Sequence, residues 1–254
     1  MKYVNKVVIV TGGGEGIGAC IANSYAKEGA HVIIAECDKD AGTEMEEYIN
    51  DNGGSAFFLK TDVSKEADVI TMVGQVVNRF GHVDILINAA AIDATGTLFT
   101  RPIDEWDRVM AVNVTGPYIC TKHVAPHMKN EGCSIVNISA TRIRTSELHT
   151  EPYLASKGAL ESLTNALANT LSPKIRVNLI SSGWVDKSQW KKKKNRKFVH
   201  LTDQDHSQYL VDRVGVPEDV AKACLFITSD EAGFITGSNL VTDGGMSVKM
   251  NCCK

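Results

Sequence analysis

The sequence lacks any cysteine pattern that would indicate a metal site or a disulfide framework. Its seven cysteines are scattered over 254 residues, with no CxxC pair and no cysteine–histidine cluster at zinc spacing. We therefore expect no metal. An odd, unpatterned set predicts reduced thiols and a cytoplasmic protein, because disulfides persist mainly in oxidising compartments. Cys252 and Cys253 in the tail have no other ligand group close in sequence, so an inert tail is favoured over a metal-binding or redox role.

Long hydrophobic runs and a strong net charge are also missing. The first apolar stretch, at 7–10, is too short for a signal-peptide core or a membrane span. The formal net charge is −3, so the overall balance gives no reason to expect nucleic acid or an anionic membrane as a partner. No internal repeat or low-complexity linker divides the chain. We expect one domain over residues 1–254, since single α/β domains often reach this length.

Short β-branched apolar runs alternate with longer amphipathic segments. The predicted strands are 7–10, 31–35, 55–59, 84–88, 134–138 and 176–180, and the predicted helices lie near 17–28, 39–50, 65–80, 104–129 and 153–171. The strands are nearly continuous in apolar residues, as parallel strands buried on both faces tend to be. Strand–helix alternation of this kind predicts βαβ units, and so an α/β fold with a parallel sheet between helical layers.

The segment VVIVTGGGEGIG places glycines directly after a predicted strand and at the start of a predicted helix. Gly12, Gly16 and Gly18 allow a tight turn and a close approach to a pyrophosphate, whose charge the free N–H groups of a helix N-terminus stabilise. A lone glycine motif is weak evidence, but here a strand precedes it, a helix follows it and an acidic residue lies downstream. The segment therefore predicts a Rossmann-type, three-layer dinucleotide-binding fold.

The choice between NAD and NADP depends on the charge near the adenosine ribose. Glu36 ends the second apolar run, eighteen residues after Gly18, where an acidic side chain can accept hydrogen bonds from ribose hydroxyls. The same carboxylate repels a 2′-phosphate, and Glu15 inside the glycine loop adds a second negative charge. No Arg or Lys occupies either position. The sequence therefore predicts NAD as the cofactor.

Further motifs follow in a fixed order along the chain. They are TGGGEGIG at 11–18, Asp62 with Val63, NAAA at 88–91, Asn113 in NVTG, Tyr153 and Lys157 in YLASK, and DGG at 243–245. In this order, over residues from about 5 to 246, they resemble the short-chain dehydrogenase/reductase family. The resemblance implies a doubly wound, seven-stranded parallel sheet with helices on both faces, and a homotetramer or homodimer. It also implies hydride transfer between the cofactor and a small secondary alcohol or carbonyl substrate.

The glycine loop, the acidic residues and the resemblance together define the residues that we expect around NAD. The expected set is Gly12, Glu15, Gly16, Ile17, Gly18, Glu36, Cys37, Asp62, Val63, Asn88, Ala89, Ala90, Tyr153, Lys157, Gly183 and Val185.

Tyr153 and Lys157 are the candidate proton-handling pair. Residues i and i+4 share a helix face, so the two side chains are expected to point the same way. A nearby ammonium, helped by the positive ring of the oxidised cofactor, can lower a tyrosine pKa from its ordinary value of about 10. The phenolate then accepts a proton from an alcohol, and the phenol returns it in the reverse reaction. The resemblance implies that Asn113 anchors a water in the proton relay.

One position departs from the family pattern. The resemblance implies a serine thirteen residues before the tyrosine, where it hydrogen-bonds the substrate oxygen, but this position is Ala140. Ser139 and Thr141 flank it, and successive strand side chains point to opposite faces, so neither is a simple replacement. Three alternatives stay open: one of these hydroxyls substitutes locally, the enzyme is slow, or the chain is a cofactor-binding protein with little activity.

The segment at about 182–213 lacks clean periodicity and follows the sixth predicted strand, so it is expected to form a substrate lid. It carries Lys187 and the basic run KKKKNRK at 191–197, and Arg142 and Arg144 follow the fifth strand. These charges could steer an anionic substrate, although a solvated face is the commoner role of a charge run. A nucleic-acid role is disfavoured, because the run has no interleaved aromatic residues.

Overall fold

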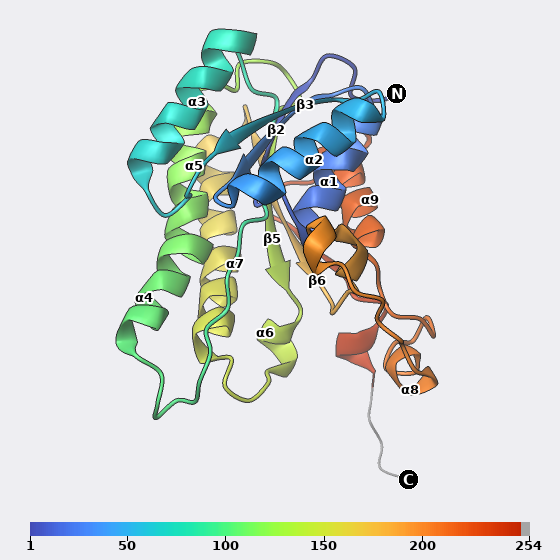
Figure 1. Cartoon of the computed structure of the whole chain (residues 1–254). Coiled ribbons are helices and arrows are strands. Elements are labelled where there is room, and N and C mark those ends of the chain that lie inside the picture. The colour runs from blue at the N-terminus through green and yellow to red at the C-terminus, as the bar shows by residue number, and fades with distance from the viewer. Residues whose placement is uncertain (250–254) are drawn as a thin grey trace.

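A seven-stranded sheet forms the centre of the computed structural model, which describes residues 1–249 (Figure 1). Every strand pair in it is parallel, and the strand order is β3-β2-β1-β4-β5-β6-β7. The strands are β1 Val7–Thr11, β2 His31–Glu36, β3 Ser55–Lys60, β4 Ile85–Asn88, β5 Ser134–Ala140, β6 Arg176–Ser182 and β7 Asn239–Thr242. The tail cysteines Cys252 and Cys253 lie outside the described residues.

Helices cover both faces of the sheet and bury a core on each (Figure 1). One layer consists of α1 Gly16–Lys27, α2 Lys39–Asp51 and α9 Pro217–Thr228, and the other of α3 Glu66–Phe80, α5 Gly116–Val124 and α7 Glu151–Leu171. The near-continuous apolar strands are explained by this arrangement, because both of their faces are covered. The predicted three-layer, doubly wound α/β fold is confirmed.

The region predicted as one helix near 104–129 is interrupted. It consists of α4 Ile103–Met110, a π-helical turn Ala111–Thr115, α5, and a 3-10 turn Ala125–His127. A π turn widens the helix by one residue without breaking its apolar pattern, so periodicity did not reveal it. The turn holds Asn113, whose side-chain bonds to another segment stabilise it.

Several elements were not predicted. They are α9, β7 and the short helices α6 Arg142–Thr145 and α8 Asp203–His206. The strand β7 has four residues, each only partly buried, so its sequence lacks the apolar run that marks the other strands. Among residues 1–249, no helix combines the length and apolarity needed to cross a membrane.

The carboxyl ends of the strands meet at the edge of the sheet from which the 182–213 segment extends, at the lower end of the molecule in Figure 1. The chain order reverses at β1, which lies between β2 and β4. Open α/β sheets bind ligands outside the carboxyl ends of their strands at such a switch point.

Candidate functional site

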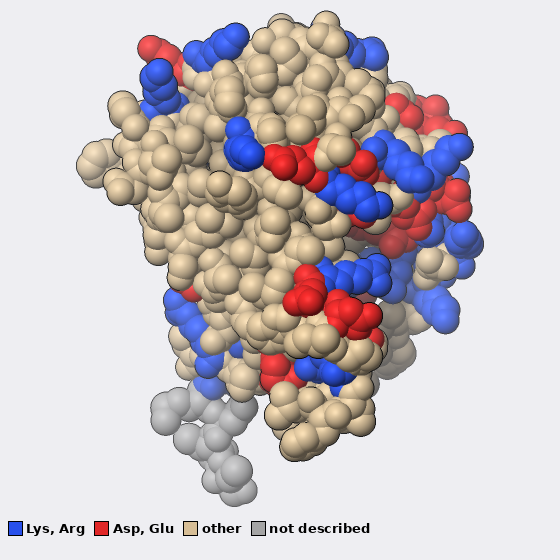
Figure 2. Space-filling view, turned by 90° about the vertical axis from the view of Figure 1, so that its left-hand side faces the viewer, with Lys and Arg blue, Asp and Glu red and all other residues tan. Residues whose placement is uncertain are grey.

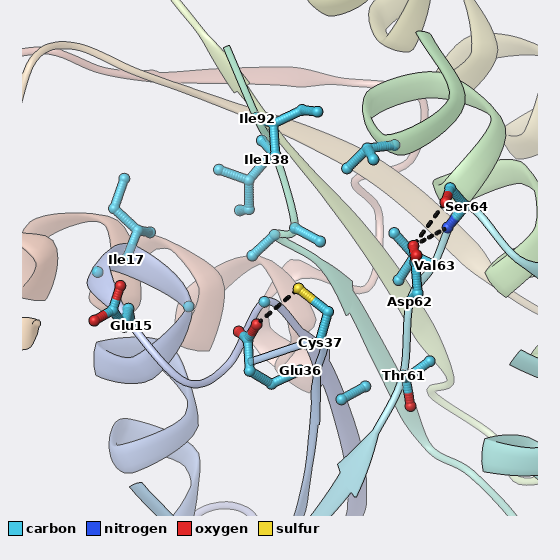
Figure 3. Close-up of a pocket in the computed structure, with 18 of the residues that line it drawn as sticks. Glu15, Ile17, Glu36, Cys37, Thr61, Asp62, Val63, Ser64, Ile92 and Ile138 are labelled. Carbon is cyan, nitrogen blue, oxygen red and sulfur yellow. Dashed lines mark hydrogen bonds between the residues drawn. The ribbon is translucent and has the colours of Figure 1, made fainter. Parts of the chain in front are cut away.

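A cavity of about 560 Å³ opens at this switch point, a size typical of small-molecule and cofactor sites. Most of the expected cofactor-binding residues line it. They are Gly12, Glu15, Gly16, Ile17, Gly18, Glu36, Cys37, Asp62, Val63, Ala89, Ala90, Tyr153 and Lys157. Figure 3 shows that the lining comes from the glycine loop, the ends of β2 and β5, and the segments after β3 and β4. Residues far apart in sequence are thus brought around one space.

The glycine loop packs too tightly for side chains at two of its positions. A Cβ on Gly18 would lie 2.1 Å from the carbonyl oxygen of Gly12, and a Cβ on Gly12 would lie 2.8 Å from Cα of Ala90. Gly12 also has a positive φ of 64°. Helix α1 begins directly after Glu15, whose side chain caps no N–H group of the helix. The first N–H groups of α1 are therefore available to an anion.

Glu36 is held by the main chain at the end of β2. Its Oε2 accepts a hydrogen bond from the Gly14 N–H at 3.3 Å, and its Oε1 accepts one from the Asp38 N–H at 3.0 Å. The Cys37 thiol donates to the same Oε1 at 3.3 Å (Figure 3). These bonds keep the carboxylate beside the cavity, where a ribose hydroxyl could donate to it and a phosphate would be repelled.

Asp62 and Val63 form the next part of the wall, after β3. Burial raises the pKa of Asp62, but the hydrogen bonds that Ser64 donates to its carboxylate, together with the Lys65 ammonium, outweigh this effect and hold the pKa below the usual value. Figure 3 shows these two bonds. A Cβ on Gly116 of α5 would lie 2.8 Å from the Val63 side chain, so α5 packs directly behind this wall.

Tyr153 and Lys157 lie one turn apart on α7 and both line the cavity. The Lys157 Nζ lies 5.5 Å from the centroid of the Tyr153 ring and donates to the carbonyl oxygen of Ile138 at 2.8 Å. Burial lowers the pKa of Lys157 to about 8. The shared helix face predicted from the spacing is confirmed, and the lysine is anchored to the end of β5.

Burial raises the pKa of Tyr153 above its ordinary value. The nearby charge of Arg142 lowers it and that of Asp93 raises it, each less than burial does. The surroundings of the phenol within the described residues therefore do not lower its pKa, although Lys157 lies on the same helix face.

Asn113 is fully buried and does not line the cavity. Its Oδ1 accepts a hydrogen bond from the Ile92 N–H at 2.9 Å, and its Nδ2 donates to the Ile92 carbonyl at 2.9 Å and to Ser156 Oγ at 3.0 Å. Ser156 in turn donates to the carbonyl of Tyr153 at 2.6 Å. Asn113 therefore connects the segment after β4 to the helix turn that carries the tyrosine.

The hydroxyls on either side of Ala140 face different surroundings. Ser139 lines the cavity, and its Oγ donates to the Lys157 carbonyl at 3.3 Å. Thr141 is buried outside the lining and donates to the Ser182 carbonyl at 3.3 Å. The strand β5 extends through Ala140, so neighbouring side chains alternate between its faces. Of the two candidates, only Ser139 is placed where a ligand could reach it.

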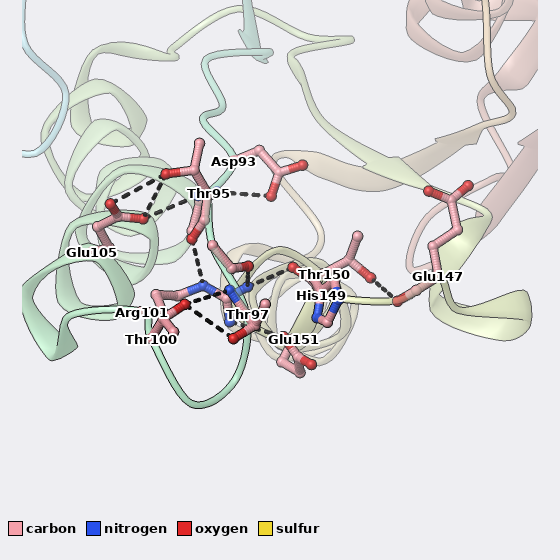
Figure 4. A network of polar contacts seen from close by, with 12 residues as sticks. Asp93, Thr95, Thr97, Thr100, Arg101, Glu105, Glu147, His149, Thr150 and Glu151 are labelled. Carbon is pink, nitrogen blue, oxygen red and sulfur yellow. Dashed lines mark hydrogen bonds and ion pairs between the residues drawn. The ribbon is translucent and has the colours of Figure 1, made fainter.

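Arg101 ties the segment after β4 to the segment that leads into α7 (Figure 4). Its side chain is 6% exposed and donates to the carbonyls of Thr95 at 3.1 Å and Gly96 at 3.0 Å in one loop. In the other, it bonds the His149 carbonyl and the Glu151 carboxylate, the latter at 2.8 Å. A lone arginine gives no sequence signal for such a role, which requires both loops to be in place.

The basic run does not gather around Tyr153. The ammonium of Lys192 pairs with Asp38, and that of Lys194 lies 3.4 Å from Asp40, both at the start of α2. The Lys192 ammonium holds the pKa of Asp38 below its usual value. Two charges of the run are thus compensated by α2, and Arg142 pairs with Glu147 at 3.1 Å. Lys191 of the run and Lys187 before it line the same cavity as Tyr153, so the anionic-substrate prediction stays a prediction.

Three expected cofactor residues lie behind the cavity wall rather than in it. Asn88 is buried and its Nδ2 donates to Asn137 Oδ1 at 2.8 Å. A Cβ on Gly183 would lie 2.8 Å from the Asp243 Cβ, and the Val185 side chain is buried in the core. Their contacts with the cofactor stay a prediction.

Ten lining residues were not expected from the sequence motifs. They are Ala35, Thr61, Ser64, Ala91, Ile92, Arg108, Val112, Ile138, Lys187 and Lys191, in addition to Ser139 and Ser182 at the strand ends. Thr61, Ser64, Ala91 and Ile92 follow the carboxyl ends of β3 and β4 closely, and this position was the signal available in the sequence for them.

Comparison with known proteins finds reductases and other oxidoreductases of similar sequence and structure. Residues 12–247 match the family described as enoyl-(acyl carrier protein) reductase. An uncharacterized oxidoreductase of Thermotoga maritima is 51% identical over 248 residues, covering 96% of this chain and 97% of that one. The meso-2,3-butanediol dehydrogenase of Serratia marcescens is 30% identical, covering 96% of each. The structure of a 3-ketoacyl-(acyl-carrier-protein) reductase from Brucella melitensis complexed with NADH is similar with a TM-score of 0.85, at 33% identity over 96% of this chain and 99% of that one.

Proposed function

Because the chain belongs to the short-chain dehydrogenase/reductase family, we propose that it transfers hydride between NAD and a small secondary alcohol or its carbonyl form. The observation that carries this proposal is that the glycine loop, Glu36, Tyr153 and Lys157 line one cavity. Binding and proton-transfer groups are thus within one ligand's length of each other. The relatives named as butanediol dehydrogenase and ketoacyl reductase support a hydroxyl–carbonyl pair as the reacting group.

In this proposal, Tyr153 accepts the hydroxyl proton of the alcohol and returns it to the alkoxide in the reverse direction. Lys157 keeps a positive charge beside the phenol below pH of about 8, the value to which burial lowers its pKa. The bound cofactor supplies hydride exchange and, when oxidised, further positive charge. Asn113 fixes the turn of α7 that presents the tyrosine, and we propose that it also holds the water of a proton relay.

The residues present fit a nicotinamide dinucleotide at three points. The uncapped start of α1 suits the pyrophosphate, and the anchored carboxylate of Glu36 suits ribose hydroxyls. The Tyr153 hydroxyl has no hydrogen-bond partner within residues 1–249, so it is free for substrate. Since a 2′-phosphate beside Glu36 would be repelled, we propose NAD rather than NADP.

The first experiment measures binding and turnover separately. We expect NADH to bind more tightly than NADPH in a side-by-side fluorescence titration. Oxidation of diols, sugars, hydroxysteroids and hydroxy acids is then followed by NADH absorbance at saturating NAD. Tighter binding of NADPH, or no binding of either cofactor, would contradict the proposal.

A second function is favoured by one observation, the absence of a hydroxyl at Ala140. A weakly active or non-catalytic NAD-binding protein would bind NADH tightly and show no turnover across the same panel. The experiment above separates the two, because binding is measured independently of chemistry.

We also propose a homotetramer or homodimer working in the cytoplasm as one domain, with the segment 182–213 acting as a substrate lid. Figure 2 shows a wide area with few charged side chains on the side of α3, α4 and α5. Ile103 at the start of α4 is 76% exposed and Tyr118 in α5 is 50% exposed, so apolar surface is available there for a second copy. Size-exclusion chromatography with light scattering tests the assembly.

A further inference from the structure

The lysines of the 182–213 segment fall into two groups that differ in their surroundings, which the sequence alone did not reveal. Lys192 and Lys194 pair with carboxylates at the start of α2. Lys187 and Lys191 instead line the cavity, and their ammonium groups have no hydrogen bond or ion pair within the described part of the chain. Two exposed cations are thus left facing the proposed cofactor space without a partner.

The main chain around these two lysines is anchored on several sides. Asp186 N–H donates to the Gly215 carbonyl at 2.9 Å, and the indole of Trp190 donates to Glu218 at 2.9 Å. The Lys192 N–H donates to Glu15 Oε1 at 2.8 Å, which joins the lid to the glycine loop. The main chain at Lys187 and Lys191 is therefore held between fixed points, so the ordering required on binding falls on the two side chains.

The lid places Lys187 directly over the start of α1. Its Cδ lies 3.4 Å from where a Cβ on Gly16 would stand, and Gly16 is the first residue of the helix. The free N–H groups of α1 and the side chain of Lys187 thus approach the same space from two directions. An anion between them would be bound by dipoles on one side and by a cation on the other.

The charge of the cavity explains why such cations are needed. Glu15, Glu36 and Asp62 all line it, and Glu15 lies at the N-terminus of α1 where phosphate would bind. A pyrophosphate carries two negative charges, and repulsion from Glu15 opposes its binding. Of the lining cations, Lys157 is buried on α7 and Arg108 belongs to α4, whereas Lys187 lies beside the start of α1 and Lys191 follows it on the same segment. Lys187 and Lys191 are therefore the cations that can offset this repulsion.

We propose that Lys187 and Lys191 form a clamp on the lid that binds the pyrophosphate oxygens of the nicotinamide dinucleotide. This inference rests on the proposed function, because it assigns residues to the same cofactor. Affinity for the cofactor then depends on the closed lid and on ionic strength, beyond what the glycine loop alone would produce. The 182–213 segment would then bind the cofactor in addition to covering the substrate.

The test measures binding to the full chain with Lys187→Ala, Lys191→Ala and the double variant. The matched controls are Lys193→Ala and Lys197→Ala, exposed lysines of the same run that do not line the cavity. Titrations use NADH, ADP-ribose, which contains the pyrophosphate but no nicotinamide, and adenosine, which contains no phosphate. We expect each single variant to weaken NADH and ADP-ribose binding about tenfold, while adenosine binding and the controls stay unchanged.

The salt dependence of binding gives a second readout. We expect the wild type to lose NADH affinity as salt rises and the double variant to lose less, because two charged contacts are gone. Lys187→Arg and Lys191→Arg should retain most of the affinity. Unchanged NADH affinity in the double variant would overturn the clamp. An equal loss of affinity for adenosine, which contains no phosphate, would overturn it too. If the wild type itself binds no NADH, the proposed function fails instead.

Discussion

The cavity has two ends that differ in how their polar groups are satisfied. We call the part lined by the glycine loop, Glu15 and Glu36 the phosphate end, and the part lined by Tyr153 and Lys157 the chemical end. At the phosphate end, the carboxylate of Glu36 already accepts hydrogen bonds from Gly14 and Asp38, and that of Glu15 accepts one from Lys192. At the chemical end, the Tyr153 hydroxyl has no partner within residues 1–249, and burial raises its pKa. Ser139 is the hydroxyl at the end of β5 that lines the cavity, whereas its neighbour Ala140 is not among the lining residues.

This difference separates binding from catalysis. The phosphate end is organised by main-chain contacts before a ligand arrives, so its affinity is a property of the folded chain. In the proposed reaction, the chemical end would also require positive charge from the cofactor and a donor to the substrate oxygen. We therefore expect substitutions at the two ends to change different measurements, and the following predictions test that separation.

Removal of the Tyr153 hydroxyl is expected to have the largest effect. Tyr153→Phe should lower kcat by about 10²–10⁴-fold, because it removes the group that transfers the proton. The dissociation constant of NADH should change little, since the phosphate end is intact. Turnover and a fluorescence titration on the same sample measure both quantities. Loss of NADH binding together with turnover would show that the two ends are not independent.

Addition of the hydroxyl that the family resemblance implies at position 140 should have the opposite sign. Ala140→Ser is expected to raise kcat by about a hundredfold, because a donor to the reacting oxygen contributes about 10²–10³ in rate. Thr141→Ser keeps a hydroxyl outside the cavity and is the control. If Ala140→Ser leaves kcat unchanged while Ser139→Ala abolishes turnover, Ser139 is the donor and the chemical end is complete without position 140.

A substitution at the phosphate end should alter the relative affinity for NADH and NADPH without changing the rate of the chemical step. Glu36→Ala is expected to shift the ratio of NADPH to NADH affinity towards NADPH by about tenfold, since about 1.4 kcal/mol of repulsion is removed. Glu47→Ala, an exposed position of α2, is the control. An unchanged ratio would mean that Glu36 does not face the 2′ position.

The smallest expected effect is on stability. Burial lowers the pKa of Lys157 from its ordinary value of 10.5 to about 8, so the folded chain releases this proton at lower pH than the unfolded chain. The contribution of Lys157 therefore destabilises the fold below pH 8, and this penalty disappears as pH rises from about 8 to about 10.5. Lys157→Met should gain stability relative to the wild type at pH 7 and lose that advantage by pH 10.

Urea denaturation at several pH values measures this difference, with Lys193→Met as the exposed control. A stability difference between wild type and Lys157→Met that does not vary between pH 7 and pH 10 would show that the lysine does not titrate in this range. The hydrogen bond that Lys157 donates to the Ile138 carbonyl is strongest while the amine is charged, so its weakening at high pH opposes this trend and does not produce it.

Much of the fold was predictable because its signals are local. The β-branched runs at β1, β2 and β5 are continuous in sequence, and the spacing of Gly12, Gly16 and Gly18 marks the turn into α1. The strand β7 and the π turn at Asn113 were missed, since one lacks an apolar run and the other keeps the helical pattern. Both depend on contacts with segments distant in the chain.

The sequence by itself determined the α/β class, the glycine loop, the acidic residue at the end of β2 and the shared face of Tyr153 and Lys157, because period and spacing encode them. Only the tertiary structure decided which hydroxyl beside Ala140 reaches the cavity and which lysines of the lid are neutralised. The physical reason is that Lys187 and Lys192 have the same chemistry. They differ only in what the fold places opposite them: the start of α1 and an open cavity in one case, and the carboxylate of Asp38 in the other.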